Sequence, residues 1–220
     1  MKTEKSICGL LAITASWTIF SAAPSSADDI IQSALLGPTG QTGGSYISGP
    51  QFSFPGQFLG VRFHLANAVI VDDVGGHLLG NGDGNIFAAI VALQSPSALP
   101  SASPFSFTPL AEVNFAPAFP STDVLVPLSL ALGPGDYALI FGSGRFGATG
   151  TANMPNNNIE TGAMTYFTSE GNFWADSVPL GDRFVITTTA VPEPAHIVFL
   201  ALWSALMQAS HRRDGKKHLK

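Results

Sequence analysis

The sequence predicts an all-β protein. We expect a jelly-roll-like β-sandwich over residues 28–190, preceded by a signal helix and followed by a short hydrophobic helix near the C-terminus. Several segments of the body alternate between apolar and other residues with a period of two, as half-buried strands do. Clusters of Gly, Pro and Asn separate these segments at the spacing of a sandwich. Charged residues make up only 11% of the chain, and amphipathic helices with Glu and Lys faces are missing.

Residues 1–27 have the composition of a secretory signal peptide. Two lysines open the segment, an apolar stretch follows over 7–20, and small residues precede a predicted cut between Ala27 and Asp28. A buried N-terminal helix or a permanent anchor would be the alternatives. The single cysteine, Cys8, lies within the apolar stretch. The mature chain would therefore have no disulfide, no thiolate metal site and no cysteine nucleophile.

About eight or nine short strands are expected, at the spacing of a sandwich. Residues 57–65 alternate strictly, so we expect one face of that strand in the core and the other in solvent. The run 86–93 is uniformly apolar and predicts a buried strand or, failing that, a short helix. Further strands are predicted at 46–47, 69–71, 123–132, 137–141, 166–167, 173–174 and 183–190.

A β-hairpin is predicted in the middle of the body. Pro134 and Gly135 occupy the positions that a tight turn favours for these residues. The flanking segments 123–132 and 137–141 both alternate. Pro127 lacks an amide hydrogen, so it indicates an edge strand or a bulge in the first of the two.

The predicted mature body is acidic. It has three arginines against twelve carboxylates, which gives a net charge of −9. Such a surface repels phosphate backbones, so we expect no nucleic-acid partner. We expect Arg62, Arg145 and Arg183 to be local ion-pair partners rather than ligand contacts.

The last thirty residues combine three elements: a proline-containing motif, an apolar segment over 197–209 and a basic end. The two prolines hold the motif extended. The apolar segment would form a helix about 20 Å long, shorter than the roughly 30 Å hydrocarbon core of a bilayer. The adjacent cations favour a membrane stop-transfer segment over the alternatives of a core helix or a permanent anchor. The motif is Val191, Pro192, Glu193, Pro194 and Ala195, and the stop-transfer cations are Arg212, Arg213, Lys216 and Lys217.

This order of elements resembles the PEP-CTERM sorting signal, which marks exosortase substrates in bacteria that make exopolysaccharide. Residues 132–144 likewise resemble a stretch that recurs in exported proteins of planctomycete type. The resemblance implies processing by signal peptidase and exosortase. It also implies a transient inner-membrane anchor and a final place at the cell surface or in the extracellular matrix.

A weak calcium candidate lies in the Gly-rich segment 80–85, where Asn81, Asp83 and Asn85 alternate with glycine. Oxygen donors alternate in this way in calcium loops, but the acidic residue that closes an EF-hand loop is missing. A tight turn explains the same residues. Asp72 and Asp73 are candidates for the missing ligands. No other cofactor is expected.

No catalytic constellation is visible in the body. His64 and His77 lack partners at metal-ligand spacing, and no G-x-S-x-G elbow is present. We therefore expect an exported, non-catalytic protein. The alternatives are a carbohydrate-binding module and a secreted hydrolase, and the sequence identifies no ligand. The module would need an aromatic platform, for which the candidates are Tyr46, Tyr137, Tyr166 and Trp174, although core packing explains such residues equally well.

Overall fold

The computed structural model describes residues 29–38, 40, 43–50, 56–82, 84–178, 180–191 and 203. The predicted signal peptide with Cys8, and the cut between Ala27 and Asp28, lie outside these residues. So do residues 192–195 of the motif, most of the apolar segment, and the four stop-transfer cations at 212, 213, 216 and 217. Within the described ranges, no helix combines the length and the apolar character needed to cross a bilayer.

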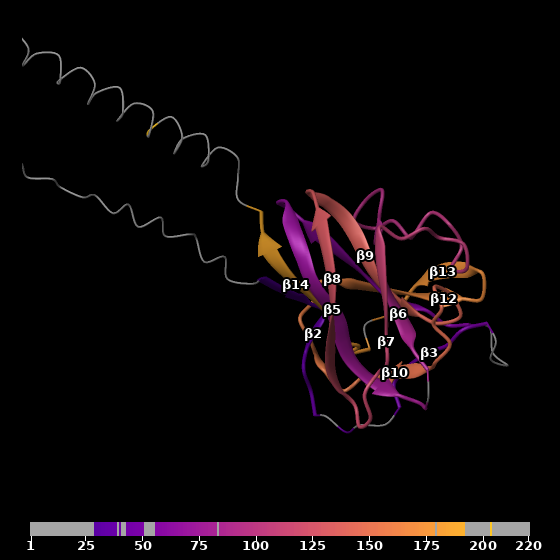
Figure 1. Ribbon diagram of the computed structural model, residues 1–220. Helices are drawn as coiled ribbons and strands as arrows, with labels where there is room; N and C mark the ends of the chain where they lie inside the picture. Colours follow the sequence, from indigo (N-terminus) through magenta and orange to yellow (C-terminus); the bar gives the residue numbers. More distant parts are fainter. Residues whose placement is uncertain are drawn as a thin grey trace, which may run out of the picture.

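Two antiparallel sheets pack together as a β-sandwich, which confirms the predicted all-β class (Figure 1). The first sheet has the order β1-β14-β5-β10-β3, and β8 pairs with the other edge of β5. The second has the order β13-β12-β4-β9-β6-β7, and β2 and β11 form a separate pair. The described residues contain fourteen strands, more than expected, because several have only two or three residues.

The strands of the first sheet are β1 (Asp29–Gln32), β3 (Ser45–Ile47), β5 (Val69–Gly80), β8 (Thr122–Leu132), β10 (Ala152–Met154) and β14 (Phe184–Ala190). Those of the second are β4 (Leu59–Leu65), β6 (Ile86–Ala92), β7 (Ala111–Phe115), β9 (Gly135–Gly142), β12 (Thr165–Glu170) and β13 (Phe173–Asp176). The separate pair consists of β2 (Ala34–Leu35) and β11 (Ile159–Glu160).

The predicted hairpin at 123–141 is wrong. β8 pairs with β5 in the first sheet, whereas β9 pairs with β4 and β6 in the second. The turn at Gly133 and Pro134 therefore carries the chain from one sheet to the other. Leu132 and Tyr137 are both buried in the core between the sheets, and the Tyr137 hydroxyl donates to the Gly133 carbonyl at 3.0 Å. A turn motif does not determine which strands pair. The burial of Leu132 and Tyr137 between the sheets favours placing their two strands in opposite sheets.

The prediction from Pro127 is confirmed. Among the described strands, β8 pairs only with β5, so it is an edge strand. The register shifts where Pro127 faces Asp73, and β8 carries one more residue there than its partner. Ser129 has a φ of 51° within this bulge. The extra residue lets the strand pass the proline without a ladder bond at that position.

The central strands β4, β6 and β9 of the second sheet are buried on both faces. Leu59, Val61 and Phe63 of β4 point into the main core, as predicted. The other face of β4 was expected to be in solvent, but it too is covered except at His64. Residues 93–107 and 146–148 pack over it and form a second apolar cluster, defined as Phe58, Phe87, Ala89, Val91, Phe107, Ala138, Ile140, Ala148 and Phe167. A strand with two buried faces has no polar side, which explains the uniformly apolar run of β6.

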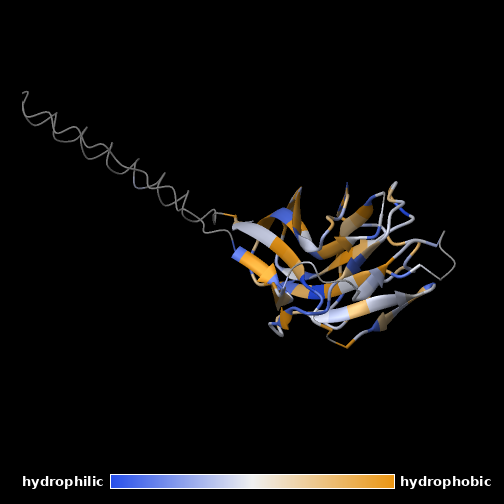
Figure 2. Ribbon diagram, turned by 90° about the horizontal axis from the view of Figure 1, so that it is seen from below, coloured by the Kyte–Doolittle hydropathy of each residue, from blue (hydrophilic) through white to orange (hydrophobic). Residues whose placement is uncertain are grey.

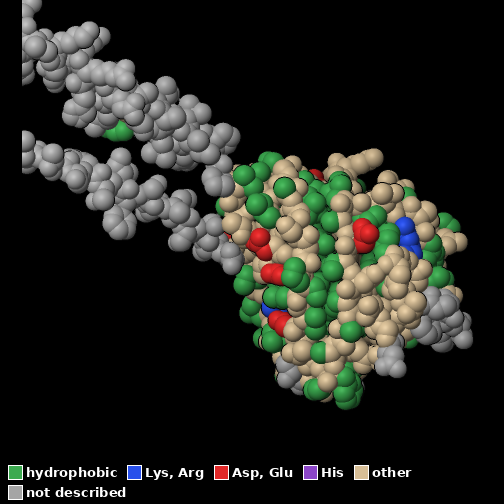
Figure 3. All heavy atoms as spheres, viewed as in Figure 1, with side chains coloured by type: hydrophobic (Ala, Val, Ile, Leu, Met, Phe, Trp, Pro, Cys, Tyr) green, Lys and Arg blue, Asp and Glu red, His purple; other side chains and the backbone are tan. Residues whose placement is uncertain are grey.

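The outer face of the first sheet is exposed along β8 but covered at the end of the sheet that holds His77 and Val185, which are both buried. Along β8 the side chains alternate between half-buried and exposed, and in Figure 2 several strands change between hydrophobic and hydrophilic segments along their length. Figure 3 shows few charged side chains on the face viewed there, in keeping with the low charged content of the chain. The two sheets therefore differ in extent: the outer face of the first is covered only at one end, whereas β4, β6 and β9 of the second are buried on both faces.

Both ends of the described body lie at the same end of the sandwich. β1 and β14 are antiparallel neighbours, and Asp29 is opposite Thr188. In Figure 1 the indigo start of β1 and the yellow end of β14 lie close together. The last strand ends at Ala190, and the Val191 amide donates to the Ala68 carbonyl at 3.3 Å.

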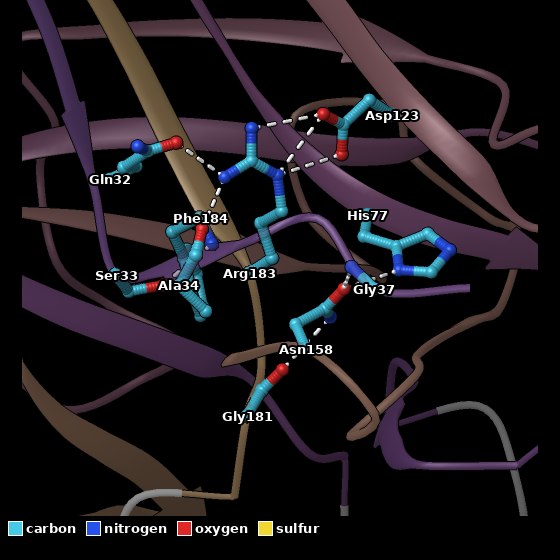
Figure 4. Close-up of polar contacts among 10 residues, drawn as sticks. All are labelled: Gln32, Ser33, Ala34, Gly37, His77, Asp123, Asn158, Gly181, Arg183 and Phe184. Atoms are coloured by element: carbon cyan, nitrogen blue, oxygen red, sulfur yellow. Dashed lines mark hydrogen bonds and ion pairs between the residues drawn. The ribbon is translucent and has the colours of Figure 1, made fainter. Parts of the chain in front are cut away.

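A buried polar cluster holds the N-terminal segment in place (Figure 4). The Arg183 guanidinium donates to both carboxylate oxygens of Asp123 at 3.0 Å, to Gln32 at 2.5 Å and to the Ala34 carbonyl. Asn158 accepts from the Gly37 amide at 2.7 Å. Arg183 and Asn158 are buried whereas their partners Asp123, Gln32 and Gly37 are half-buried, so the costly loss would be that of the bonds to the two buried side chains. They fix β1 and β2 against strands from the other end of the chain.

Glycines in the second sheet make room for aromatic rings. A Cβ atom at Gly60 would lie 2.3 Å from Cζ of Phe167. One at Gly142 would lie 2.4 Å from Cζ of Phe87 and 2.7 Å from Cδ1 of Phe58. All three distances are far below van der Waals contact, so the second apolar cluster requires glycine at these positions.

Gly142→Ala should lower the free energy of unfolding by about 1–3 kcal/mol, because the added methyl overpacks the cluster. Gly133→Ala is the matched control, since a Cβ atom there meets nothing within 4 Å. Denaturant unfolding of both variants measures the effect. Equal stability of the two would contradict the packing described here.

Candidate functional site

A pocket of about 450 Å³ opens at the edge of the second sheet. Its walls are Arg62 from β4, Thr165 and Tyr166 from β12, Asp176 and Ser177 at the end of β13, and the segment 96–97 of the covering loop. Its volume lies within the roughly 300–1,000 Å³ typical of small-molecule sites. It is the candidate binding site of the body.

Arg62 is the central residue of this pocket. It projects from the covered face of β4 and is 6% exposed. Its Nε donates to the Ala98 carbonyl at 2.8 Å, Nη1 donates to Thr165 Oγ1 at 3.3 Å, and Nη2 pairs with Asp176. The guanidinium carbon lies 5.2 Å from the centre of the Phe167 ring. These contacts fix a cation that would otherwise be mobile.

The sheet register brings these partners together. Thr165 of β12 is directly opposite Arg62 of β4. Asp176 of β13 is opposite Phe167, two residues further along β12. The Asp176 side chain is 75% exposed, so its carboxylate faces solvent while its partner Arg62 is buried. The site thus presents an acid at its surface and a cation at its base.

Tyr166 closes the inner side of the pocket. Its hydroxyl donates to the Asp182 carbonyl at 3.0 Å, and burial raises the pKa of the phenol. Tyr166 is therefore a neutral group at physiological pH. Its ring is buried in the main core, and it contributes no charge to the pocket.

Asp182 is a buried acid behind Tyr166 and does not line the pocket. Burial raises its pKa from 3.8 to about 6, a hydrogen bond with Ser45 opposes this, and the charge of Glu160 adds to it. Its Oδ1 has no hydrogen-bond partner among the described residues. Glu160 accepts from the Gly181 amide at 2.7 Å. Neither of these two carboxylates lines the pocket, so they do not form in it the carboxylate pair that a glycosidase uses.

Asp182 should make folding stability depend on pH. Its pKa is higher in the folded chain than in the unfolded chain, so its contribution is intact below about pH 4 and is lost as pH rises through about 6. Above pH 7 the cost is about 3 kcal/mol. Asp182→Asn should match the native chain at about pH 4 and exceed its stability, by up to that amount, at about pH 7.5. Denaturant unfolding across this range tests it, and a pH-independent difference would contradict it.

The two predicted histidines lie in different sheets. His64 of β4 is exposed, and its Nδ1 lies 2.7 Å from Asp136 Oδ1. His77 of β5 is fully buried, and its Nδ1 lies 2.9 Å from Asn158 Oδ1. Neither histidine lines the pocket. Among the described residues, no three His, Cys, Asp or Glu side chains lie close enough to hold a metal ion.

The calcium candidate is only partly described, because Asp83 lies outside the described residues. Asn81 donates to Asn153 across the end of the sheet. Asp72 and Asp73 do not reach this turn. Asp73 lies eight residues before Asn81 along β5, which is about 26 Å at roughly 3.3 Å per residue. The hydroxyls of Thr187 and Thr189 donate to the carboxylates of Asp73 and Asp72.

The aromatic candidates do not form an exposed platform. Tyr137 and Tyr166 are buried in the main core. Trp174 packs against the second apolar cluster, and its Nε1 donates to the Ala102 carbonyl at 2.8 Å. Tyr46 is half-buried on β3, in the other sheet. Core packing therefore accounts for three of the four.

The prediction that the arginines form ion pairs is right for Arg62 and Arg183 and wrong for Arg145. Arg145 lies 4.4 Å from the ring centres of both Phe107 and Phe146. Its guanidinium donates to the carbonyls of Pro104 and Phe107. Aromatic faces and carbonyls replace a carboxylate as its partners.

The sequence analysis missed the pocket. Its two charged residues are 114 positions apart, and no local motif joins them. The available signal was a cation on an otherwise apolar strand, because a buried arginine needs a partner. The sequence matches no protein-family model. A search of the curated proteins also finds no match.

Proposed function

We propose that this chain is an exported, non-catalytic protein of the cell surface or extracellular matrix, delivered by its C-terminal tail. A signal peptide at 1–27 would start export, and signal peptidase would cut after Ala27. The apolar segment and the cations after it would hold the chain transiently in the inner membrane. Exosortase would then act at the motif that begins at Val191.

The observation that carries this proposal is the junction between body and tail. The last strand ends at Ala190, and the motif begins at the next residue. β14 is an interior strand of its sheet, paired with β1 on one side and β5 on the other. A tail attached to such a strand can be cut without removing any part of the sandwich.

The strand order supports a jelly-roll-like arrangement within the sandwich. Four strands of the first sheet run β1-β14-β5-β8, and four of the second run β4-β9-β6-β7. Eight strands in two sheets, with the chain passing repeatedly between them, are characteristic of this architecture. β12 and β13 extend the second sheet beyond β4 and form two walls of the pocket.

A second candidate function is binding of polysaccharide, and the pocket beside Arg62 favours it. The pocket combines a fixed guanidinium, an exposed carboxylate and hydroxyl groups on strands of a rigid sheet. Such groups form the hydrogen bonds by which proteins bind hydroxylated ligands. This role is compatible with delivery to a polysaccharide matrix.

Deleting residues 192–220 should leave a folded, soluble body that no longer stays with the cell envelope. The deletion keeps Val191, whose amide is bonded to Ala68. Fractionation of the producing cells and their medium measures the effect, and a melting curve of the released protein checks its fold. An unchanged location of the truncated chain would refute the sorting role.

A second variant separates the tail's charge from its length. Replacing Arg212, Arg213, Lys216 and Lys217 with Ala keeps the chain complete but removes the predicted stop-transfer signal. We expect reduced retention at the inner membrane.

The intact mass of the native mature protein should correspond to cleavage after Ala27 and within the tail. A mass that matches the uncut chain would contradict both cleavages.

A further inference from the structure

The ion pair between Arg62 and Asp176 leaves some of its hydrogen-bond donors and acceptors unused. Arg62 has five N–H donors, and three of them are used on Ala98, Thr165 and Asp176. Two remain, one on each terminal nitrogen. Asp176 spends one oxygen on Arg62, and its carboxylate is otherwise open to solvent. Donors and acceptors therefore lie side by side at the mouth of the pocket.

The charge of the site argues against an anionic ligand. The exposed carboxylate of Asp176 already compensates the charge of Arg62, and the acid lies nearer to solvent. An incoming carboxylate would meet Asp176 first and be repelled. The acidic body, with a net charge of −9, adds to this repulsion.

A neutral ligand with adjacent hydroxyl groups satisfies both partners. Each hydroxyl can donate a hydrogen bond and accept another. One can donate to Asp176 while its neighbour accepts from a spare N–H of Arg62. Ser97, Thr165 and Ser177 provide further hydroxyls around the same space. Bonds to charged groups are stronger than bonds between neutral groups, so Asp176 and Arg62 would contribute most of the recognition.

We propose that the pocket formed by Arg62 and Asp176 binds the adjacent hydroxyls of a neutral sugar ring. The proposal rests on the second candidate function and adds the chemical class of the ligand. Asp176 accepts from one hydroxyl, and Arg62 donates to the neighbouring hydroxyl from the base of the pocket. The Asp176 carboxylate, which accepts a hydrogen bond from the neutral ring, excludes a uronic acid by charge repulsion.

Calorimetric titration of the full-length protein in mild detergent tests this. Maltotetraose and mannotetraose are the neutral probes, and tetragalacturonate is the acidic probe. The native chain should bind at least one neutral probe and bind it more tightly than tetragalacturonate. Asp176→Asn should weaken neutral binding at least about tenfold, because the charged acceptor is lost. It should also strengthen binding of tetragalacturonate, because the repulsion is removed.

Asp136→Asn is the matched control. Asp136 is a carboxylate of the same sheet that contacts His64 outside the pocket, and its replacement should leave all three affinities unchanged. Melting curves check that both variants fold, which the exposure of Asp176 favours.

Three outcomes would overturn the proposal. Tighter binding of tetragalacturonate by the native chain would replace the neutral ligand with an acidic one and leave saccharide binding standing. Unchanged neutral binding in Asp176→Asn would place the ligand elsewhere on the protein. Absence of binding to every probe would remove the second candidate function as well, whereas the sorting role is tested separately by cell fractionation.

Discussion

Aromatic packing on the outer face of the second sheet is the constraint on which the candidate site depends. Phe58, Phe87 and Phe107 pack together there and hold the loop 93–110 against the sheet. Arg145 contacts the rings of Phe107 and Phe146 and donates hydrogen bonds to carbonyls of that loop. Without this cover, Arg62 would lose the Ala98 carbonyl and the pocket would lose one wall. Packing energy is thus used to fix the geometry of a polar site.

The two sheets differ in how much of their surface is buried and in the contacts that stabilise them. The central strands of the second sheet are buried on both faces and rely on rings and glycines. The first sheet leaves the outer side of β8 in water and buries its outer face only at the end that holds His77 and Val185. At that end Arg183 forms hydrogen bonds with groups far away in the sequence. Without the Asp123 carboxylate, the buried charge of Arg183 would lack its ion-pair partner. Removing that carboxylate should therefore weaken the attachment of the N-terminal segment. The N-terminal segment is therefore held mainly by charged hydrogen bonds, whereas the loop that forms one wall of the pocket is held mainly by apolar packing.

Sequence reasoning identified local features better than long-range ones. Alternation in β4 correctly placed Leu59 and Val61 in the core, because a period of two determines the face whatever covers it. It could not show that the opposite face is covered, since that depends on a loop some thirty residues away. β5 was predicted only at 69–71, because Asp72, Asp73 and two glycines interrupt its apolar pattern. A Cβ atom at Gly75 would lie 1.8 Å from the Val124 carbonyl oxygen, so the close approach of β8 explains the glycine at this position.

The proposed delivery and the proposed binding would be physically separable in this architecture. The tail follows β14, in the first sheet, whereas the pocket is formed by β4, β12, β13 and a loop on the second. No lining residue of the pocket belongs to β1 or β14. Changes at distant sites without shared partners usually have additive effects. A chain without its tail should therefore keep its affinity for the ligand, and a chain without the Asp176 charge should still reach its destination. If either change altered both properties, the body and its tail would have to act as one unit, and the separation argued here would fail.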